Sequence, residues 1–129
     1  MNKKRRILLA GCVLAFSLPA HSADVVDELL ARYQAEGAQN IDAARGEQLW
    51  KQKHGDRSCT TCHGMDLTKP GKHQRTGKAI RPMAPSANPE RLTKLRKVEK
   101  WFLRNCKWTL GRECSAQEKA DILAWLRTL

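Results

Sequence analysis

The stretch Cys59-Thr60-Thr61-Cys62-His63 determines how the rest of this chain is interpreted. Two thiols three positions apart, followed at once by an imidazole, form the pattern that attaches a c-type haem covalently. The thiols can add to the two porphyrin vinyl groups as thioethers, and His63 can then bind the iron as its proximal ligand. Because all three groups must meet one rigid macrocycle, the spacing has to be short. The sequence therefore predicts one covalent haem c held by Cys59, Cys62 and His63.

Two other kinds of site use a similar cysteine pair, and both fit this sequence less well. A thioredoxin-like redox pair needs a βαβ context, and no strand pattern surrounds Cys59 and Cys62. A structural zinc site needs a second pair of ligands at a suitable spacing, and none is evident. Covalent haem attachment is therefore the preferred interpretation of the motif.

The N-terminal segment has the composition of a secretory signal peptide. Basic residues at positions 3–6 precede an apolar run over residues 7–18, and small residues follow it. The run is too short for a transmembrane helix, so we predict that residues 1–23 direct export to the periplasm and are then removed. Leu9-Ala10-Gly11-Cys12 looks like a lipobox, and a lipid anchor at Cys12 is the minor alternative.

The composition is that of a small basic domain. The chain has 129 residues, with 24 lysines and arginines against 13 aspartates and glutamates. The predicted signal peptide contains four of the basic residues and none of the acidic ones, so the remainder carries a net charge of about +7. That remainder has the size of one domain, without repeats or a transmembrane segment. Because the basic charge accompanies no nucleic-acid-binding motif, we expect no nucleic-acid partner.

The cysteines outside the haem motif form a pair. Cys12 lies in the predicted signal peptide, which leaves Cys106 and Cys114. In an oxidising compartment, an even number of remaining cysteines favours a disulfide between them. The alternative is two buried free thiols. The bridge would close a short loop, so we expect it to influence local geometry more than global stability.

Apolar periodicity and capping signals predict an all-α protein. Ser115 and Glu118 form a capping box at the start of the last helix, which should pack across the second helix near Trp50. Gly46 in the second helix either allows close approach of another helix or is simply tolerated. We expect helices over residues 24–39, 40–53, 88–95, 95–110 and 116–126, with a long loop over residues 64–88.

The loop over residues 64–88 shows no helical or strand period. Loops of this length are usually functional, and we expect this one to wrap the edge of the haem. It contains no acidic residue after Asp66, and its basic residues are Lys69, Lys72, Arg75, Lys78 and Arg81. These cations could offset the haem propionates, form a docking patch for an acidic partner, or belong to a solvated loop.

The second axial ligand of the iron has to be chosen mainly between Met83 and Asn105. Methionine is the common partner of histidine in electron-carrying cytochromes c, but Met83 follows the haem motif closely, in a Pro-rich loop. Asn105 continues the helical spacing of Trp101 and Phe102, where a buried amide needs a backbone partner or the iron. We favour Asn105, whose amide oxygen is a weak ligand for ferrous iron, over Met83, and His73 or an open iron are lesser alternatives.

The chain as a whole resembles class I cytochromes c, in which helices wrap around one covalent haem. More narrowly, it is similar to the sphaeroides haem protein (SHP) group of high-spin monohaem cytochromes c. The segments that carry this resemblance are Thr68-Lys69-Pro70-Gly71-Lys72-His73, Pro82-Met83-Ala84-Pro85-Ser86, Lys97-Val98-Glu99-Lys100-Trp101-Phe102, Arg104-Asn105-Cys106 and Gly111-Arg112-Glu113-Cys114. We therefore divide the chain into a signal peptide (1–23), an N-terminal helical extension (24–39) and a cytochrome c domain (40–129).

The resemblance implies a function that involves gas binding. In the SHP group an asparagine binds the oxidised iron and leaves on reduction, so that the iron can bind oxygen or nitric oxide, and this ligand maps to Asn105. The neighbouring disulfide of that group maps to Cys106 and Cys114. The usual electron donor is a dihaem cytochrome c, and oxygenase or reductase activity on the bound gas is compatible with such a protein. The alternative is a plain electron carrier in which Met83 stays bound.

Overall fold

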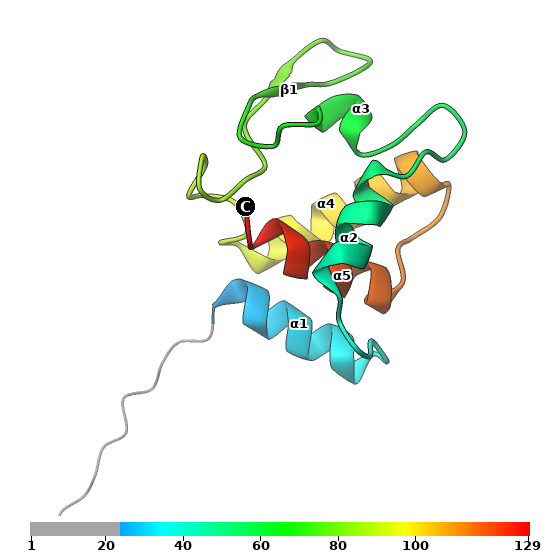
Figure 1. Ribbon diagram of the computed structural model, residues 1–129, viewed down its shortest axis with the longest axis vertical. Coiled ribbons are helices and arrows are strands. Elements are labelled where there is room, and N and C mark those ends of the chain that lie inside the picture. The colour runs from blue at the N-terminus through cyan, green and yellow to red at the C-terminus, as the bar shows by residue number, and fades with distance from the viewer. Residues whose placement is uncertain (1–23) are drawn as a thin grey trace, which may run out of the picture.

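The structure, a computed structural model, describes residues 24–129. The predicted signal peptide, with Cys12, lies outside the described residues. The described helices are α1 (Val25–Ala35), α2 (Ala43–Lys51), α3 (Thr60–His63), α4 (Leu95–Leu110) and α5 (Ala116–Leu126), and β1 (Gly71–Lys72) pairs antiparallel with β2 (Ala79–Ile80). Figure 1 shows α1 along the lower edge and α3 with the hairpin at the top, with α2, α4 and α5 between them. The predicted helical fold is confirmed, with one short hairpin added.

The crossing of α2 and α5 lies at the centre of the fold. Gly46 is buried in α2, and a Cβ atom at this position would overlap the backbone carbonyl of Asp121 in α5. The Trp50 and Trp125 rings pack next to this crossing, with centroids 5.8 Å apart. The predicted packing of the last helix across the second is therefore confirmed, and Gly46 serves close approach rather than being merely tolerated.

A buried carboxylate ties α5 to the start of α2. The Asp121 side chain is only 3% exposed and accepts hydrogen bonds from the backbone N–H of Asp42 (2.8 Å), from Arg45 Nε (2.6 Å) and from Gln117 Nε2 (3.0 Å). A buried charge with this number of donors is compensated. The network therefore fixes the register in which the two helices cross.

The capping box predicted at the start of α5 is present. Ser115 Oγ accepts from the backbone N–H of Glu118 at 3.2 Å, and the Glu118 carboxylate accepts from the backbone N–H of Ser115 at 2.8 Å. Arg112 adds two hydrogen bonds of 2.8 Å to the same carboxylate. These contacts, with Arg112 first, hold the pKa of Glu118 below its usual value.

Helix α1 closes the lower side of the core. Asp24 caps its N-terminus, and Val26, Leu29 and Tyr33 are buried. The Tyr33 ring meets Phe102 of α4 edge to face, with centroids 6.5 Å apart, and its hydroxyl donates to Glu99 Oε1 at 2.7 Å. Burial, supported by the Glu99 carboxylate, raises the pKa of Tyr33. The segment predicted as a helical extension therefore contributes to the same core as α4 and α5.

Helix α4 ends where the sequence predicted and is fastened there by a disulfide. Its last residue is followed by Gly111 with a φ of +74°, a conformation that favours glycine. Cys106 and Cys114 are bonded, with Cα atoms 5.5 Å apart, which confirms the predicted bridge. The bridge connects α4 to the short segment before α5.

Two local predictions are wrong. Residues 88–95 form turns rather than a helix, because Leu92 takes a φ of +60°, which a helix does not allow. The Arg91 side chain also ties this segment to the preceding loop by donating to the carbonyls of Arg81 and Pro82. The loop over residues 64–88 contains the β1–β2 hairpin, although no strand was expected there.

Among residues 24–129, no helix combines the length and the apolar character needed to cross a membrane.

Candidate haem site

The Cys-x-x-Cys-His motif is held in a single helical turn. Ser58 is buried, and its backbone N–H donates to Thr61 Oγ1 at 2.9 Å, while its hydroxyl lies 2.6 Å from Thr60 Oγ1. The backbone N–H of His63 donates to the Cys59 carbonyl at 3.2 Å, and Gly64 ends the turn with a φ of +74°. The two thiols and the imidazole predicted to act together are thus presented by one short element.

The two motif thiols do not have the properties of a redox pair. Cys59 and Cys62 are half-buried and not bonded to each other. Burial raises the pKa of Cys59 to about 11. A hydrogen bond with the Thr109 hydroxyl acts in the opposite direction but has a smaller effect on this pKa. A reactive C-x-x-C needs a thiol that ionises easily, which this one does not. No cluster of three metal-binding side chains occurs among residues 24–129, so a zinc site receives no support there either.

His63 is a neutral imidazole enclosed on one side. Its ring packs against Trp50, with centroids 5.3 Å apart, and Trp50 in turn packs against Trp125. Burial lowers the pKa of His63 to about 4, and the positive charge of Arg91 acts in the same direction. His63 Nδ1 is buried without a hydrogen-bond partner among the described residues. A neutral imidazole with Nδ1 enclosed can offer its other nitrogen to a metal.

The C-terminal end of α4 lies near the start of the motif, where Arg57 donates to the Trp108 carbonyl at 3.0 Å. Thr109 of α4 reaches Cys59, and Asn105 lies one helical turn earlier on the same helix. The buried side of α4 consists of Phe102, Cys106 and Thr109, whereas Trp101 is 42% exposed and Asn105 is exposed. Asn105 thus lies one residue from this buried stripe, and its role as a ligand of the iron stays a prediction.

The other two candidate ligands are engaged elsewhere. Met83 is half-buried and packs against the hydrophobic core, and its backbone N–H donates to the Leu67 carbonyl at 3.0 Å. His73 is exposed, and its Nδ1 accepts from the backbone N–H of Thr76 at 3.2 Å within the hairpin. Neither side chain belongs to α4, the helix that carries Asn105.

Sequence reasoning missed two residues of this region. Trp50 was expected to pack at the helix crossing but not to support His63, as it does. Arg91 was not considered, since the segment around it was predicted to be a helix. Its guanidinium donates to the carbonyls of Pro82 at 2.7 Å and Arg81 at 2.5 Å, and its charge acts on His63. No periodic or motif signal distinguishes this arginine in the sequence.

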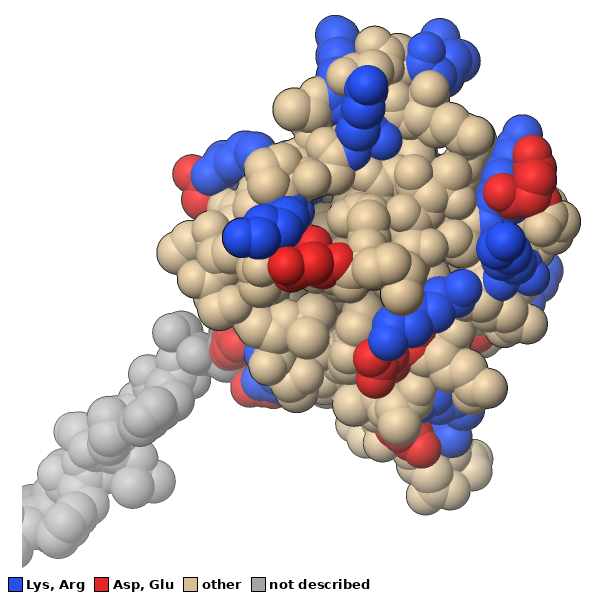
Figure 2. Space-filling model, turned by 45° about the horizontal axis from the view of Figure 1, so that its top comes forward, with Lys and Arg blue, Asp and Glu red and all other residues tan. Residues whose placement is uncertain are grey.

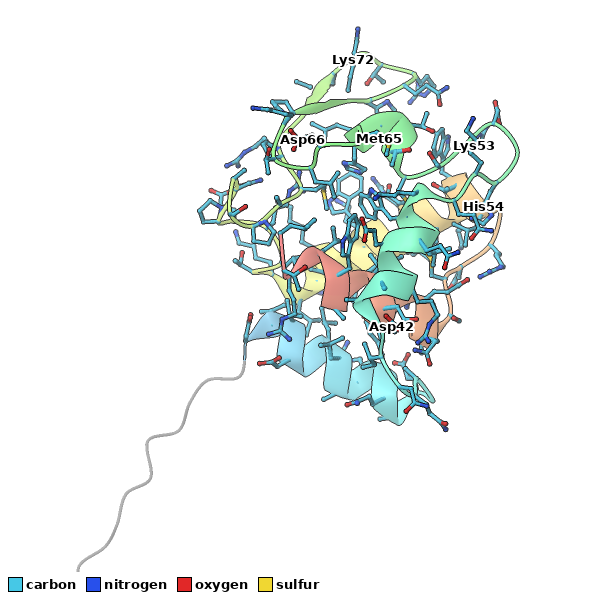
Figure 3. All side chains as sticks on the ribbon, in the orientation of Figure 1. Asp42, Lys53, His54, Met65, Asp66 and Lys72 are labelled. Carbon is cyan, nitrogen blue, oxygen red and sulfur yellow. A yellow bond between two sulfur atoms is a disulfide. The ribbon has the colours of Figure 1, made fainter. Side chains whose placement is uncertain are left out.

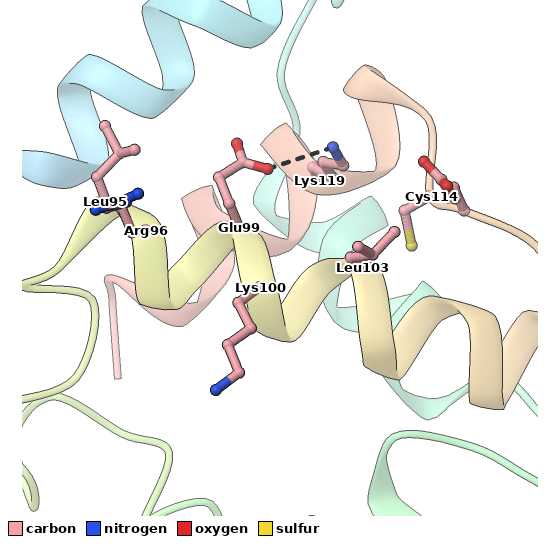
Figure 4. A pocket seen from close by; sticks show the side chains of 8 residues that line it. Leu95, Arg96, Glu99, Lys100, Leu103, Cys114 and Lys119 are labelled. Atoms are coloured by element: carbon pink, nitrogen blue, oxygen red, sulfur yellow. Dashed lines mark ion pairs between the residues drawn. The ribbon is translucent and has the colours of Figure 1, made fainter.

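A separate hollow lies along the opposite part of α4. It has a volume of about 480 Å³ and is lined by Leu95, Arg96, Glu99, Lys100, Leu103, Glu113, Cys114 and Lys119. Figure 4 shows Glu99 facing Lys119 across it, at an Oε2–Nζ distance of 3.6 Å. None of its lining residues belongs to the motif, so we do not assign the haem to it.

Comparison with known proteins agrees with these observations. Residues 36–126 match a family described only as a domain of unknown function (DUF1924). The chain is 46% identical to the cytochrome c-type protein SHP of Cereibacter sphaeroides, over 94% of this chain and 96% of that protein. The chain belongs to the SHP family of c-type cytochromes.

The solved structures of SHP-like proteins support the same fold. The structure of oxidised SHP, described as an oxygen-binding cytochrome c, matches with a TM-score of 0.75 and 45% identity over 84% of this chain and all of that chain. The solution structure of cytochrome c'' from Methylophilus methylotrophus matches with a TM-score of 0.68 and 31% identity, over 81% and 93% of the two chains. As a member of the SHP family, the chain is a c-type cytochrome that carries covalently bound haem. The unbridged thiols and the neutral imidazole on α3 fit that group.

Proposed function

We propose that this SHP-family chain is an exported electron-transfer cytochrome that binds oxygen or nitric oxide when its iron is reduced. In this proposal Cys59 and Cys62 attach the haem, His63 is the proximal ligand, and Asn105 is released from the iron on reduction. The observation that carries the proposal is the position of Asn105 on α4, one helical turn before Thr109, whose hydroxyl interacts with Cys59. The relative SHP is described as oxygen-binding, and the work on cytochrome c'' concerns haem-ligand detachment.

Bound haem supplies an iron that accepts one electron and, once ferrous, takes up a diatomic gas. In this proposal the chain would supply two ligands to that iron, His63 and Asn105. His63 is kept neutral by burial and oriented by Trp50. Asn105 offers an amide oxygen, which is a hard donor and a poor match for the softer ferrous iron. Reduction would therefore weaken the bond between this oxygen and the iron. Cys106, the residue after Asn105, is bonded to Cys114, which keeps this part of α4 in place while the ligand leaves and returns.

The disulfide also supports the proposed location. Disulfides persist in oxidising compartments such as the bacterial periplasm. Cys106 and Cys114 form such a disulfide. We infer that residues 1–23 direct the chain to that compartment. There a redox partner supplies the electrons, and a dihaem cytochrome c is the candidate donor.

The absorption spectrum of the holoprotein tests this proposal. We expect the anaerobically reduced protein to be high-spin and its spectrum to change on adding carbon monoxide. Asn105→Ala should keep the haem attached and should bind imidazole in the oxidised state at least about 10-fold more tightly, because the competing internal ligand is gone.

Met83→Leu is the matched control, since it removes the other candidate ligand and should leave both spectra unchanged. A plain electron carrier would instead give a low-spin reduced spectrum that does not change when carbon monoxide is added. Its methionine–iron band would be lost in Met83→Leu. The two variants thus separate the two functions.

A further inference from the structure

The β1–β2 hairpin presents a cluster of positive charge. Four exposed side chains belong to this segment: Lys69, Lys72, Arg75 and Lys78. In Figure 2, basic side chains gather at the end of the molecule that carries the hairpin, while the carboxylates on that face lie away from them. We call these four residues the hairpin cations.

The hairpin cations are not neutralised by the protein. Within residues 24–129, none of the four has a carboxylate within 4.0 Å, whereas neighbouring Arg81 pairs with Glu90 at 2.7 Å. Asp66 is the acid closest in sequence, and its Oδ1 accepts from the hydroxyl (2.6 Å) and the backbone N–H (3.0 Å) of Thr68. The hairpin therefore keeps a net positive charge that can attract an acidic surface.

The first strand of this hairpin packs directly on the turn that carries the haem motif. A Cβ atom at Gly71 of β1 would overlap the backbone carbonyl of Cys62 and would lie 2.9 Å from the Cα atom of His63. Only glycine allows strand β1 to approach α3 this closely. A protein that contacts the hairpin is therefore separated from the motif by little more than one layer of backbone.

An exposed apolar side chain borders the same region. Met65 follows α3 by two residues and is 71% exposed. Figure 3 shows Met65 and Asp66 beside α3, with Lys72 above them on the hairpin. Met65 also lines a shallow hollow of about 250 Å³ together with Leu67 and Trp125. A small apolar spot with a charged rim is the anatomy of a transient protein interface.

We propose that Met65 and the hairpin cations form the docking surface for an acidic electron-transfer protein. This inference rests on the electron-transfer part of the proposed function and names where the donor binds. Opposite charges steer the encounter, and Met65 provides the apolar contact in the docked complex. Each productive encounter moves one electron from the donor, which is oxidised, to ferric haem, which becomes ferrous, without transfer of a proton or another group.

A second basic region provides a matched control. Lys94, Arg96 and Lys97 are exposed at the start of α4, a helix that packs against α1. The triple variant Lys69→Glu/Lys72→Glu/Lys78→Glu and the triple variant Lys94→Glu/Arg96→Glu/Lys97→Glu change the net charge of the protein by the same amount. A difference between them therefore reports the position of the charge rather than its total.

The test is the rate at which an acidic one-electron donor, dithionite-reduced flavodoxin, reduces each holoprotein in anaerobic stopped-flow experiments. At low ionic strength we expect the hairpin triple variant to react about 10-fold more slowly than the wild type and the α4 triple variant to change by less than about 3-fold. The wild-type rate should fall as salt is added. Met65→Gln should lower the rate without changing its salt dependence.

Several outcomes would overturn the proposal. Equal slowing by both triple variants would show an effect of net charge alone, and unchanged rates in the hairpin variant would exclude this surface. Unchanged flavodoxin kinetics together with lost binding to phosphatidylglycerol vesicles would assign the hairpin to a membrane surface instead. Carbon monoxide binding should be the same in all variants, so a failure of the gas-binding function is detected separately from a failure of docking.

Discussion

Replacing Gly46 with alanine should destabilise the holoprotein by about 1–4 kcal/mol. A new methyl group would overlap the backbone carbonyl of Asp121 and lie 2.7 Å from the backbone nitrogen of Ile122. These are atoms of α5, which cannot yield without moving the side chains around Trp50. Overpacking of this kind costs about 1–3 kcal/mol, and the wider helix separation adds lost burial of about 1–2 kcal/mol. Alanine has a higher helix propensity than glycine, which offsets about 1 kcal/mol of this destabilisation.

Guanidinium denaturation of the holoprotein, followed by circular dichroism, measures this change. Gln48→Ala is the matched control, because Gln48 is exposed on the same helix and its replacement should change the free energy of unfolding by less than about 0.5 kcal/mol. If Gly46→Ala proves as stable as the wild type, α2 and α5 do not cross in contact at Gly46. The packing of Trp50 against His63 would then need a different explanation.

Three further predictions concern the contacts that hold α4 and α5. The double variant Cys106→Ala/Cys114→Ala should lose about 2–3 kcal/mol in denaturation, the value expected for a loop with a sequence separation of 8; an unchanged midpoint would contradict this. Arg45→Ala should cost about 2–4 kcal/mol, because the buried Asp121 carboxylate loses its guanidinium partner, and Arg45→Lys should recover part of the loss. The folded-state pKa of Glu118 is lowered, so its stabilisation is present above the unfolded pKa of about 4.3 and is lost as pH falls below it. Denaturation of Glu118→Gln should accordingly show reduced stability at pH 7 and a weaker loss between pH 5 and pH 3, and parallel pH profiles for variant and wild type would argue against this role.

Short-range signals explain which parts of the fold were predictable. The capping box at Ser115 and the glycine after α4 act within a few residues, and both appear where the sequence placed them. The Cys106–Cys114 bridge followed from counting cysteines and is present. The haem motif is local too, and its thiols and imidazole fall on one helical turn.

The parts that were not predictable depend on contacts between distant segments. The strands of the hairpin are two residues long and therefore carry no alternation to detect. Arg91 prevents a helix after residue 88 by binding carbonyls about ten residues away. Which residues of α4 are buried depends on how Phe102 meets Tyr33 of α1, so the buried stripe differs from the predicted one by one residue although the helix was placed correctly.

The four cysteines among the described residues form two pairs that require different oxidation states. Their solvent exposure bears on how the protein matures. In the proposed haem site, Cys59 and Cys62 would have to be reduced thiols when thioether bonds form, whereas the Cys106–Cys114 bridge remains oxidised. The first pair is half-buried, and the second pair is buried more completely, at 5% and 7% exposure. A reductase that attacks accessible sulfur can therefore prepare the haem-binding thiols of a folded chain without opening the bridge. Solvent access thus adds to the sequence motif in separating the two pairs during assembly.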